Sequence, residues 1–426
     1  MNKYLCALAA LVMFCACSSD EEIPAKDPEP KPDIPVVTPP VESTSNAEIG
    51  VARLLTLDPK LNLGGAATYE WSVTSAPDKA YSLTRSNEEK ALLFAHTAGQ
   101  YILKLQAKKE NKSYIHTLTL TVHPAATPLS PYIAKVYDLL LAPGQFTNTL
   151  PEFVEGDTRA EIVKKAGDCL VGKKNGALMS LGGFGGYIVF GFDHTIENVQ
   201  GKRDLRIMAN AFYSNANPNP DASIKGGSCE PGIVMVAYDV NGNGEPDDAW
   251  YEIAGSEYNK PATIHNYEIT YFRPTTEEAD ETAEGWQTIA KYIRWEDNQG
   301  HSGYKAKNMF HNQTYYPQWI KEDQITFRGT LLANNAVDES GDGSYWVLYS
   351  YGFGYADNAL NNEDDSAIDI DWAVDANGAK VHLPGVDFVK VYTATNQECG
   401  WLGESSTEIA GAYDLHIANE VVESVK

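Results

Sequence analysis

The chain has 426 residues, of which 43% are hydrophobic and 11% aromatic, and its formal net charge is −25 at pH 7. The hydrophobic content is sufficient for two globular domains. The negative charge argues against a nucleic acid as partner, since phosphate backbones are bound by basic patches. No apolar run after the N-terminal segment approaches the ~18 residues of a membrane-spanning helix, so we expect a lipid to be the only membrane anchor.

The N-terminal segment has the features of a secretory signal. Lys3 is followed by an apolar stretch from Leu5 to Phe14. The sequence Phe-Cys-Ala-Cys that ends at Cys17 resembles a bacterial lipobox, which implies removal of residues 1–16 and acylation of Cys17. An ordinary secretory signal with an incidental cysteine is the alternative. The segment Ser18–Glu22 resembles the export signal of Bacteroidetes lipoproteins, which implies the outer face of the outer membrane.

The next segment, residues 17–45, is rich in proline and charge and has few large apolar side chains. Such a segment cannot bury a core and stays extended. We predict that it forms the lipid anchor and a stalk.

Residues 46–123 have the alternation of an all-β module. Tyr69–Val73, with Trp71 at its centre, Gly99–Leu105 and Thr117–Val122 each follow a period of two. This pattern resembles the PKD-like, immunoglobulin-type sandwiches of bacterial surface proteins.

Residues 130–426 form the main predicted domain. Thr158 and Glu161 have the spacing of a capping box and predict a helix with Ile162, Val163 and Ala166 on one face. A glycine-dense turn at 182–186 then leads directly into a strand, so it lacks the helix that a dinucleotide-binding loop requires. Ile188, Phe190 and Phe192 are expected on the core face of that strand. Further predicted strands are Asp204–Ile207, Ile233–Tyr238, Ala249–Ile253, Glu268–Phe272, Tyr345–Tyr349, Asp369–Trp372 and Phe388–Tyr392.

The predicted fold class is therefore dominated by β-structure. We expect an immunoglobulin or PKD-like sandwich, followed by a larger jelly-roll sandwich with one or two short helices.

A short oxygen-rich segment predicts a calcium site. Asp239, Asn241 and Asn243 occupy positions one, three and five, and Gly244 follows at position six. Trp250 replaces the bidentate glutamate of an EF-hand at position twelve, so the shorter calcium turn of β-rich extracellular proteins is the better match. An asparagine-rich hairpin turn without metal is the alternative. The predicted ligands of this structural calcium ion are Asp239, Asn241, Asn243, Glu245, Asp247 and Asp248.

Two other groups of polar residues carry weaker signals. The acidic stretch from Asp357 to Asp371 is interpreted mainly as a solvated loop followed by a strand, because its ligand spacing is irregular; binding of a cation is the alternative. Cys169, Cys229 and Cys399 match no zinc or redox motif, so we expect small buried residues with at most one disulfide.

Aromatic residues gather between Trp286 and Trp401, many of them in loops rich in glycine and asparagine. Aromatic faces beside amide groups suit sugars and large planar ligands, although any single ring belongs more often to a core. The predicted ligand-binding residues are Tyr304, Tyr315, Trp319, Trp346, Tyr351, Phe353, Tyr355, Asn358, Asn361 and Trp401.

Catalytic patterns are weak. Neither a Gly-x-Ser-x-Gly elbow nor a His-Glu-x-x-His zinc motif occurs, and His194 beside Asp193 has no evident nucleophile. With 58 acidic residues, a glycosidase-type carboxylate pair cannot be selected from sequence. We therefore predict a binding protein and not an enzyme.

The main domain resembles a family through several segments together. These are the strand at 180–192, Asn210-Ala-Phe, Glu230-Pro-Gly-Ile-Val with the calcium-like loop and Trp250-Tyr-Glu, and the segment from Asn396 to Glu408. They resemble Bacteroidetes "cell surface protein" lipoproteins, and the first half of the domain is similar to galactose-binding-like jelly rolls.

Lipoproteins of this kind resemble those encoded in vitamin B12 uptake loci. The resemblance implies capture of cobalamin or another corrinoid beside an outer-membrane TonB-dependent transporter and companion surface lipoproteins. It assigns no individual binding residue. A glycan-binding lipoprotein or glycosidase accessory fits the same features, and an adhesin without a small ligand is the third possibility.

Overall fold

The computed structural model describes residues 39–214, 225–281 and 283–424. The predicted signal peptide, Cys17 and most of the predicted stalk lie outside these residues. Residues 40–426 form one compact unit. Among the described residues, no helix has the length and apolar character needed to cross a membrane.

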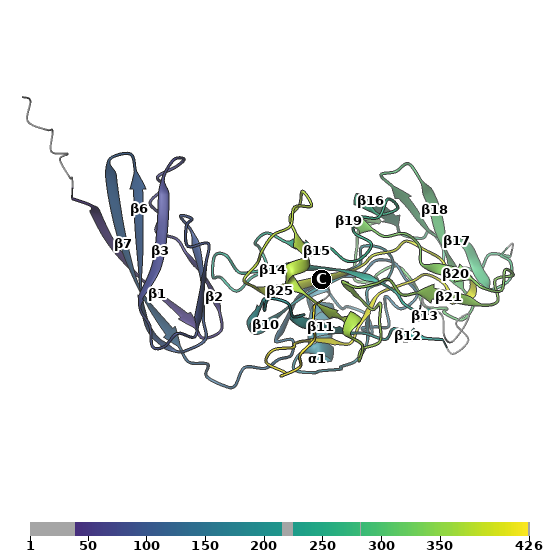
Figure 1. The fold of residues 1–426 in the computed structure, drawn as a ribbon. Coiled ribbons are helices and arrows are strands. Elements are labelled where there is room, and N and C mark those ends of the chain that lie inside the picture. The colour runs from purple at the N-terminus through teal and green to yellow at the C-terminus, as the bar shows by residue number, and fades with distance from the viewer. Residues whose placement is uncertain (1–38, 215–224, 282, 425–426) are drawn as a thin grey trace, which may run out of the picture. The chain divides into compact units, whose positions relative to one another are not determined.

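The first module consists of two small sheets (Figure 1). One sheet has the strand order β1-β7-β6-β3 and the other β2-β5-β4. The predicted strands around Trp71, Leu103 and Leu120 are confirmed, and these three side chains are buried in one core. The strands are β1 (Val41–Gly50), β2 (Leu54–Leu57), β3 (Thr68–Ser75), β4 (Tyr81–Thr84), β5 (Ala91–Ala95), β6 (Gly99–Lys109) and β7 (Lys112–His123).

The module begins earlier than the sequence pattern indicates. Strand β1 starts at Val41, inside the range predicted as stalk, and pairs in parallel with β7 from Tyr114 onward. Its first six residues are exposed, so hydrogen bonding to β7, and not burial of apolar side chains, keeps this segment extended.

The described residues after β7 add one α-helix and many short strands, which confirms the prediction of a fold dominated by β-structure. These elements are β8 (Lys135–Leu140), α1 (Arg159–Leu170), β9 (Met179–Ser180), β10 (Tyr187–Glu197), β11 (Leu205–Met208), β12 (Phe212–Tyr213), β13 (Gly226–Ser228), β14 (Gly232–Ala237), β15 (Tyr251–Ile253), β16 (Ile264–Phe272), β17 (Gln287–Asp297), β18 (Ser302–Asn308), β19 (Gln324–Leu331), β20 (Ala336–Asp338), β21 (Trp346–Tyr349), β22 (Tyr355–Ala356), η1 (Asp364–Ser366), β23 (Ala367–Ile368), η2 (Ile370–Trp372), β24 (Ala373–Val374), β25 (Gly385–Thr393), η3 (Gly400–Leu402), β26 (Glu408–Ile409) and β27 (Gly411–Asp414).

A central sheet with the order β24-β15-β14-β25-β10-β8 is buried on both faces. Along β14, Val234 and Val236 belong to one core cluster, whereas Ile233 belongs to the other. Along β25, Val391 and Tyr392 divide in the same way. This division follows from the period of two in a strand, which points successive side chains to opposite faces.

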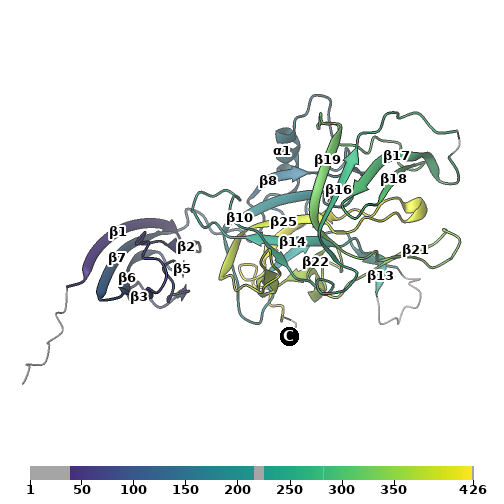
Figure 2. The same ribbon diagram turned by 90° about the horizontal axis from the view of Figure 1, so that it is seen from above.

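Different elements cover the two faces (Figure 2). The first face packs against α1 and the small sheet β23-β11-β27, with Ile188, Phe190 and Phe192 in this core as predicted. The second face packs against the sheet β18-β17-β16-β19 through a core rich in tyrosine. The β16–β19 sheet therefore forms a wall beside the central sheet.

Helix α1 confirms the capping prediction. The hydroxyl of Thr158 accepts a hydrogen bond from the backbone N–H of Glu161, and the Glu161 carboxylate accepts one from the N–H of Thr158. Ile162, Ala166 and Leu170 are buried on one face.

The glycine-dense segment before β10 is a tight turn. Gly182 has φ +74°, and a Cβ placed there would lie 2.0 Å from the carbonyl oxygen of Ala142. Any larger residue would displace the turn that positions β10.

The prediction of a strand at Asp369–Trp372 is wrong. Residues Ile370–Trp372 form a 3-10 helix, because the Asp369 carboxylate caps it by accepting a hydrogen bond from the N–H of Asp371. This side chain-to-backbone bond competes with a strand ladder, and alternation of apolar residues does not report it.

The capping box gives a first prediction. Replacing Thr158 with alanine removes the cap acceptor and should destabilise the protein by about 1 kcal/mol. Thermal melting should show a small decrease in Tm for Thr158→Ala, and Thr158→Ser should melt like the wild type. Equal melting of wild type and Thr158→Ala would contradict this role for the cap.

Candidate functional site

Four of the predicted ligand-binding residues are buried in the fold. Tyr315, Trp319, Tyr355 and Asn358 are each at most 7% exposed. The amide of Asn358 exchanges hydrogen bonds with the backbone of Tyr351, and the hydroxyl of Tyr315 accepts one from the N–H of Asn308. In this structure these side chains hold loops in place and present no surface to a ligand.

The other predicted residues lie apart from one another. Tyr304 borders a separate hollow, and Tyr351 packs against the tyrosine-rich core. Phe353 packs against Trp372, while Asn361 binds the backbone of Ala209. The indole nitrogen of Trp346 is buried without a hydrogen-bond partner among the described residues.

Trp401 is the one exposed tryptophan of the predicted set, at 41%, and its ring lies 6.2 Å from that of Phe310. The structure therefore does not bring the ten predicted residues into a single pocket.

The Asp239 turn connects β14 to β15, which pair as an antiparallel hairpin. The Asp239 carboxylate accepts hydrogen bonds from the N–H groups of Gly242, Asn243 and Gly244. The amides of Asn241 and Asn243 both donate to Asp247 at 3.0 Å. Four of the predicted ligands thus converge inside the turn.

The remaining two predicted ligands of the turn have other partners. Glu245 forms an ion pair with Lys135 at 3.1 Å, and Asp248 accepts a hydrogen bond from the N–H of Val240. The calcium prediction is untested by these contacts.

One hollow of the main domain lies between the central sheet and the β16–β19 wall. This open cleft has a volume of about 720 Å³. Trp250, Tyr258 and His265 supply aromatic rings, and Asn266 and Asn377 supply carboxamides. Charged side chains complete the lining: Glu252, Glu268, Arg328, Asp375 and Lys390.

A β-bulge places part of this lining. The pairing of β16 with β19 shifts between Ile264 and Tyr267, and Asn266 has φ +56°. The ring of His265 lies 4.4 Å from that of Tyr258 and hydrogen-bonds to the carbonyl of Tyr258. Bulges of this kind redirect side chains and occur often beside functional sites.

Burial perturbs two charged groups in the open cleft. The pKa of Glu252 is raised to about 7 by burial, although a hydrogen bond from the Thr330 hydroxyl opposes the rise. Its second carboxylate oxygen, Oε1, has no hydrogen-bond partner among the described residues. The pKa of Lys390 is lowered by burial. Perturbed groups in a cleft mark a candidate functional site.

A second hollow, the acidic pocket, has a volume of about 360 Å³. Phe146 and His311, whose rings pack edge to face at 4.8 Å, line it together with Leu402. The carboxylates of Glu230, Glu404 and Glu408 also face it, and burial raises the pKa of each.

The acidic pocket includes residues that sequence reasoning did not select. Glu230 and Glu408 line the pocket, and Asp357, which the sequence pattern predicts in a solvated loop, is 3% exposed and lies beside them. More than a hundred residues separate Glu230 from Asp357, so no local spacing could report their contact. The only available signal was that the segments carrying the family resemblance include Glu230 and Glu408.

The three cysteines of the main domain are free thiols. Burial is the main cause that raises the pKa of Cys229 and Cys399. Both therefore stay protonated and behave as small buried residues, as expected.

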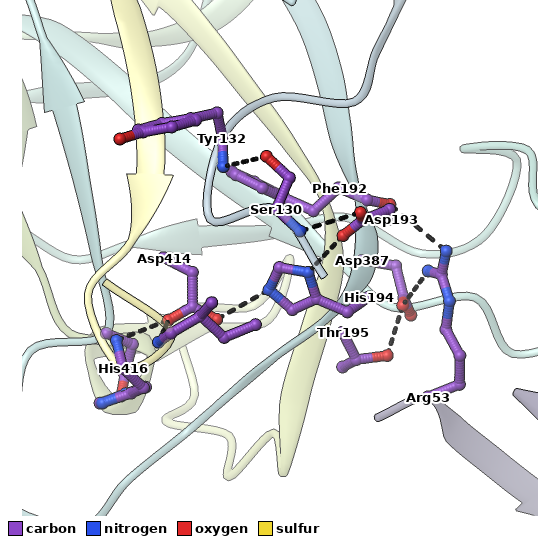
Figure 3. Close-up of polar contacts among 12 residues, drawn as sticks. Arg53, Ser130, Tyr132, Phe192, Asp193, His194, Thr195, Asp387, Asp414 and His416 are labelled. Carbon is purple, nitrogen blue, oxygen red and sulfur yellow. Dashed lines mark hydrogen bonds and ion pairs between the residues drawn. The ribbon is translucent and has the colours of Figure 1, made fainter. Parts of the chain in front are cut away.

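The buried side chain of His194 bridges two aspartates (Figure 3). Its Nδ1 lies 2.7 Å from Asp193 and its Nε2 lies 2.8 Å from Asp414. Asp193 also accepts a hydrogen bond from the N–H of Ser130. The histidine thus links the start and the end of the main domain and is 1% exposed, which leaves no room for a substrate.

Comparisons with known proteins identify a fold likeness only. No known protein family and no curated protein matches the sequence. Among solved structures, the PKD domain of human KIAA0319 is 22% identical and matches 21% of this chain and 89% of its own, with a TM-score of 0.18. The PKD domain of the KIAA 1837 protein is 23% identical over 22% of this chain and 87% of its own, with a TM-score of 0.17.

A 2,6-sialyltransferase from Photobacterium is 13% identical over 26% of this chain and 22% of its own, with a TM-score of 0.18. The chain is thus weakly similar to PKD domains over a small part of its length. The resemblance to the lipoproteins of B12 loci stays a hypothesis.

Glu252 predicts a pH dependence of stability. Between its ordinary pKa of 4.5 and about 7, the unfolded chain loses this proton while the folded chain keeps it. The stability that this group contributes is fully present below pH 4.5 and is lost as pH rises to 7, by roughly 3 kcal/mol. Glu252→Gln should lack this component, so its Tm should exceed that of the wild type increasingly from pH 5 to pH 8. A constant difference across this range would contradict the assignment.

Proposed function

We propose that this protein is a surface lipoprotein that captures a corrinoid such as cobalamin for an outer-membrane TonB-dependent transporter and its companion lipoproteins. The protein would be anchored through Cys17 on the outer face of the outer membrane. The proposal rests on the resemblance of the sequence segments and on one structural observation, the composition of the open cleft.

The open cleft supports binding of a ligand that is apolar on one face and rich in amides at its edge. Trp250, Tyr258 and His265 offer aromatic surface, and Asn266 and Asn377 offer donors and acceptors beside it. A corrin ring carries carboxamides around a broad, partly apolar face, so the two chemistries match. A volume of about 720 Å³ would hold part of such a ligand, leaving the remainder exposed for transfer.

Titration calorimetry with cyanocobalamin tests the proposal. Wild-type protein should bind one equivalent, and Trp250→Ala should bind at least tenfold more weakly, which corresponds to ~1.4 kcal/mol. Because Trp250 borders the Asp239 turn, its replacement also alters the surroundings of that turn. Tyr258→Ala is therefore a second variant, and its affinity for cyanocobalamin should fall by a similar factor.

The matched controls are Tyr304→Ala and Trp401→Ala, which remove exposed aromatic rings outside the open cleft. Both should bind like the wild type. Weaker binding by these variants, with Trp250→Ala unchanged, would move the site to the aromatic loops predicted from sequence. No binding by the wild type would overturn corrinoid capture and direct the search to a carbohydrate array, because rings beside carboxamides also suit sugars.

We further propose that the Asp239 turn holds a structural calcium ion. The convergence of Asp239, Asn241, Asn243 and Asp247 supports it, since all four offer oxygen ligands within one tight turn. Calcium should raise the Tm of the wild type relative to chelator, and Asp239→Ala should reduce this rise. Identical wild-type melting in calcium and in chelator would remove the metal from the turn.

A further inference from the structure

We propose that Glu230, Asp357 and Glu408, the first and last of which line the acidic pocket, form a second cation site, which takes a hard divalent ion such as Ca²⁺ or Mn²⁺. This site is independent of the open cleft and of the Asp239 turn. It lies where three segments distant in sequence meet, directly before β14, directly after β22 and at the start of β26.

The geometry of the three carboxylates suits one ion. One oxygen from each residue lies within 4.8 Å of the other two. That limit is twice the ~2.4 Å bond length of calcium to oxygen, so a single ion can contact all three. Among the described residues, no other set of three histidine, cysteine or acidic side chains meets this criterion.

Hydrogen bonds hold two of the carboxylates in place. Glu230 accepts from the N–H of Ser406 at 2.9 Å and from the hydroxyl of Ser228 at 3.2 Å. Glu408 accepts from the hydroxyl of Ser406 at 2.8 Å. Ligands oriented in advance by neighbouring donors are typical of metal sites.

Two buried oxygens lack hydrogen-bond partners. One belongs to the three carboxylates, and the other lines the acidic pocket. Oδ2 of Asp357 accepts a hydrogen bond from the N–H of Glu408, but Oδ1 has no partner among the described residues although the side chain is 3% exposed. Oε1 of Gln145, which lines the same pocket and is 5% exposed, is also unpaired. An unpaired buried acceptor is costly, and a cation held by the three carboxylates would satisfy Oδ1 of Asp357.

No side chain of the described part of the chain neutralises the three carboxylates. Two lysines of the described residues pair with other acids, Lys225 with Glu363 and Lys305 with Glu398. Buried charges of like sign require either protons or a counter-ion. The all-oxygen donor set favours a hard cation, and the protonated thiols of Cys229 and Cys399 offer nothing to a soft one.

The test measures bound metal in the Asp239→Ala variant, which removes the turn as a competing site. After chelation and dialysis against Ca²⁺ or Mn²⁺, this variant should hold one ion per chain and its Tm should rise by several degrees. The double variant Asp239→Ala/Glu408→Gln should hold none and show no metal-dependent rise. Asp239→Ala/Glu252→Gln, which neutralises a buried acid of the open cleft, is the matched control and should still bind one ion.

A second readout separates a metal from shared protons. Without metal at pH 8, Glu408→Gln should melt above the wild type, because it relieves repulsion among buried carboxylates. If this rise occurs but Asp239→Ala binds neither Ca²⁺ nor Mn²⁺, the three acids only share protons and the proposal is overturned. Metal binding that survives both Glu408→Gln and Asp357→Asn would overturn it equally.

Asp357→Asn also covers the case in which the glutamine variant fails to fold. Titration with cyanocobalamin in the presence of chelator measures corrinoid binding without any bound metal. A failure of corrinoid capture is therefore distinguishable from a failure of this cation site.

Discussion

The main domain depends on the burial of strand β25 between β10 and β14. Both neighbours pair with it antiparallel, and its two faces enter different cores through Val391 and Tyr392. A strand buried on both faces has a fixed register, because a slip by one residue would exchange the two sets of side chains. The chain that leaves β25 returns with Glu404 and Glu408, so this register also determines where the acidic pocket forms.

The buried polar groups of this fold are of two kinds: some are paired with one another, and others keep an unpaired oxygen. His194 sits between Asp193 and Asp414, and Asp204 contacts His416 at 2.8 Å, so these charges support the structure. In contrast, Glu252 and Gln145 each retain an unpaired buried oxygen and line a hollow, and Asp357 retains one beside Glu230 and Glu408. Unpaired groups of this kind reduce stability, and their presence beside cavities is the reason for placing function there.

Local sequence patterns predicted local structure well. The capping box at Thr158, the strand carrying Phe190, the turn at Gly182 and the β14–β15 hairpin around Asp239 are all confirmed, because each depends on residues close together in the chain. The strand predicted at Asp369–Trp372 is wrong, because a side-chain cap favours a 3-10 helix there. The alternation of apolar residues does not report such a cap. The predicted ligand-binding aromatic residues lie apart in the fold, and their role in binding stays a prediction. Two of these rings, Tyr315 and Tyr355, pack inward.

The sequence by itself determined the β-rich class, the helix and the tight turn at Asp239, since these follow from backbone periodicity and short-range hydrogen bonds. Only the tertiary structure decided which side chains share a cavity. Trp250 joins Tyr258 and His265 through the β16 bulge, and Glu230 meets Asp357 and Glu408 across three separate segments. The physical reason is that sheet pairing brings distant residues together, and the register of those pairs is set by the packing of the whole core.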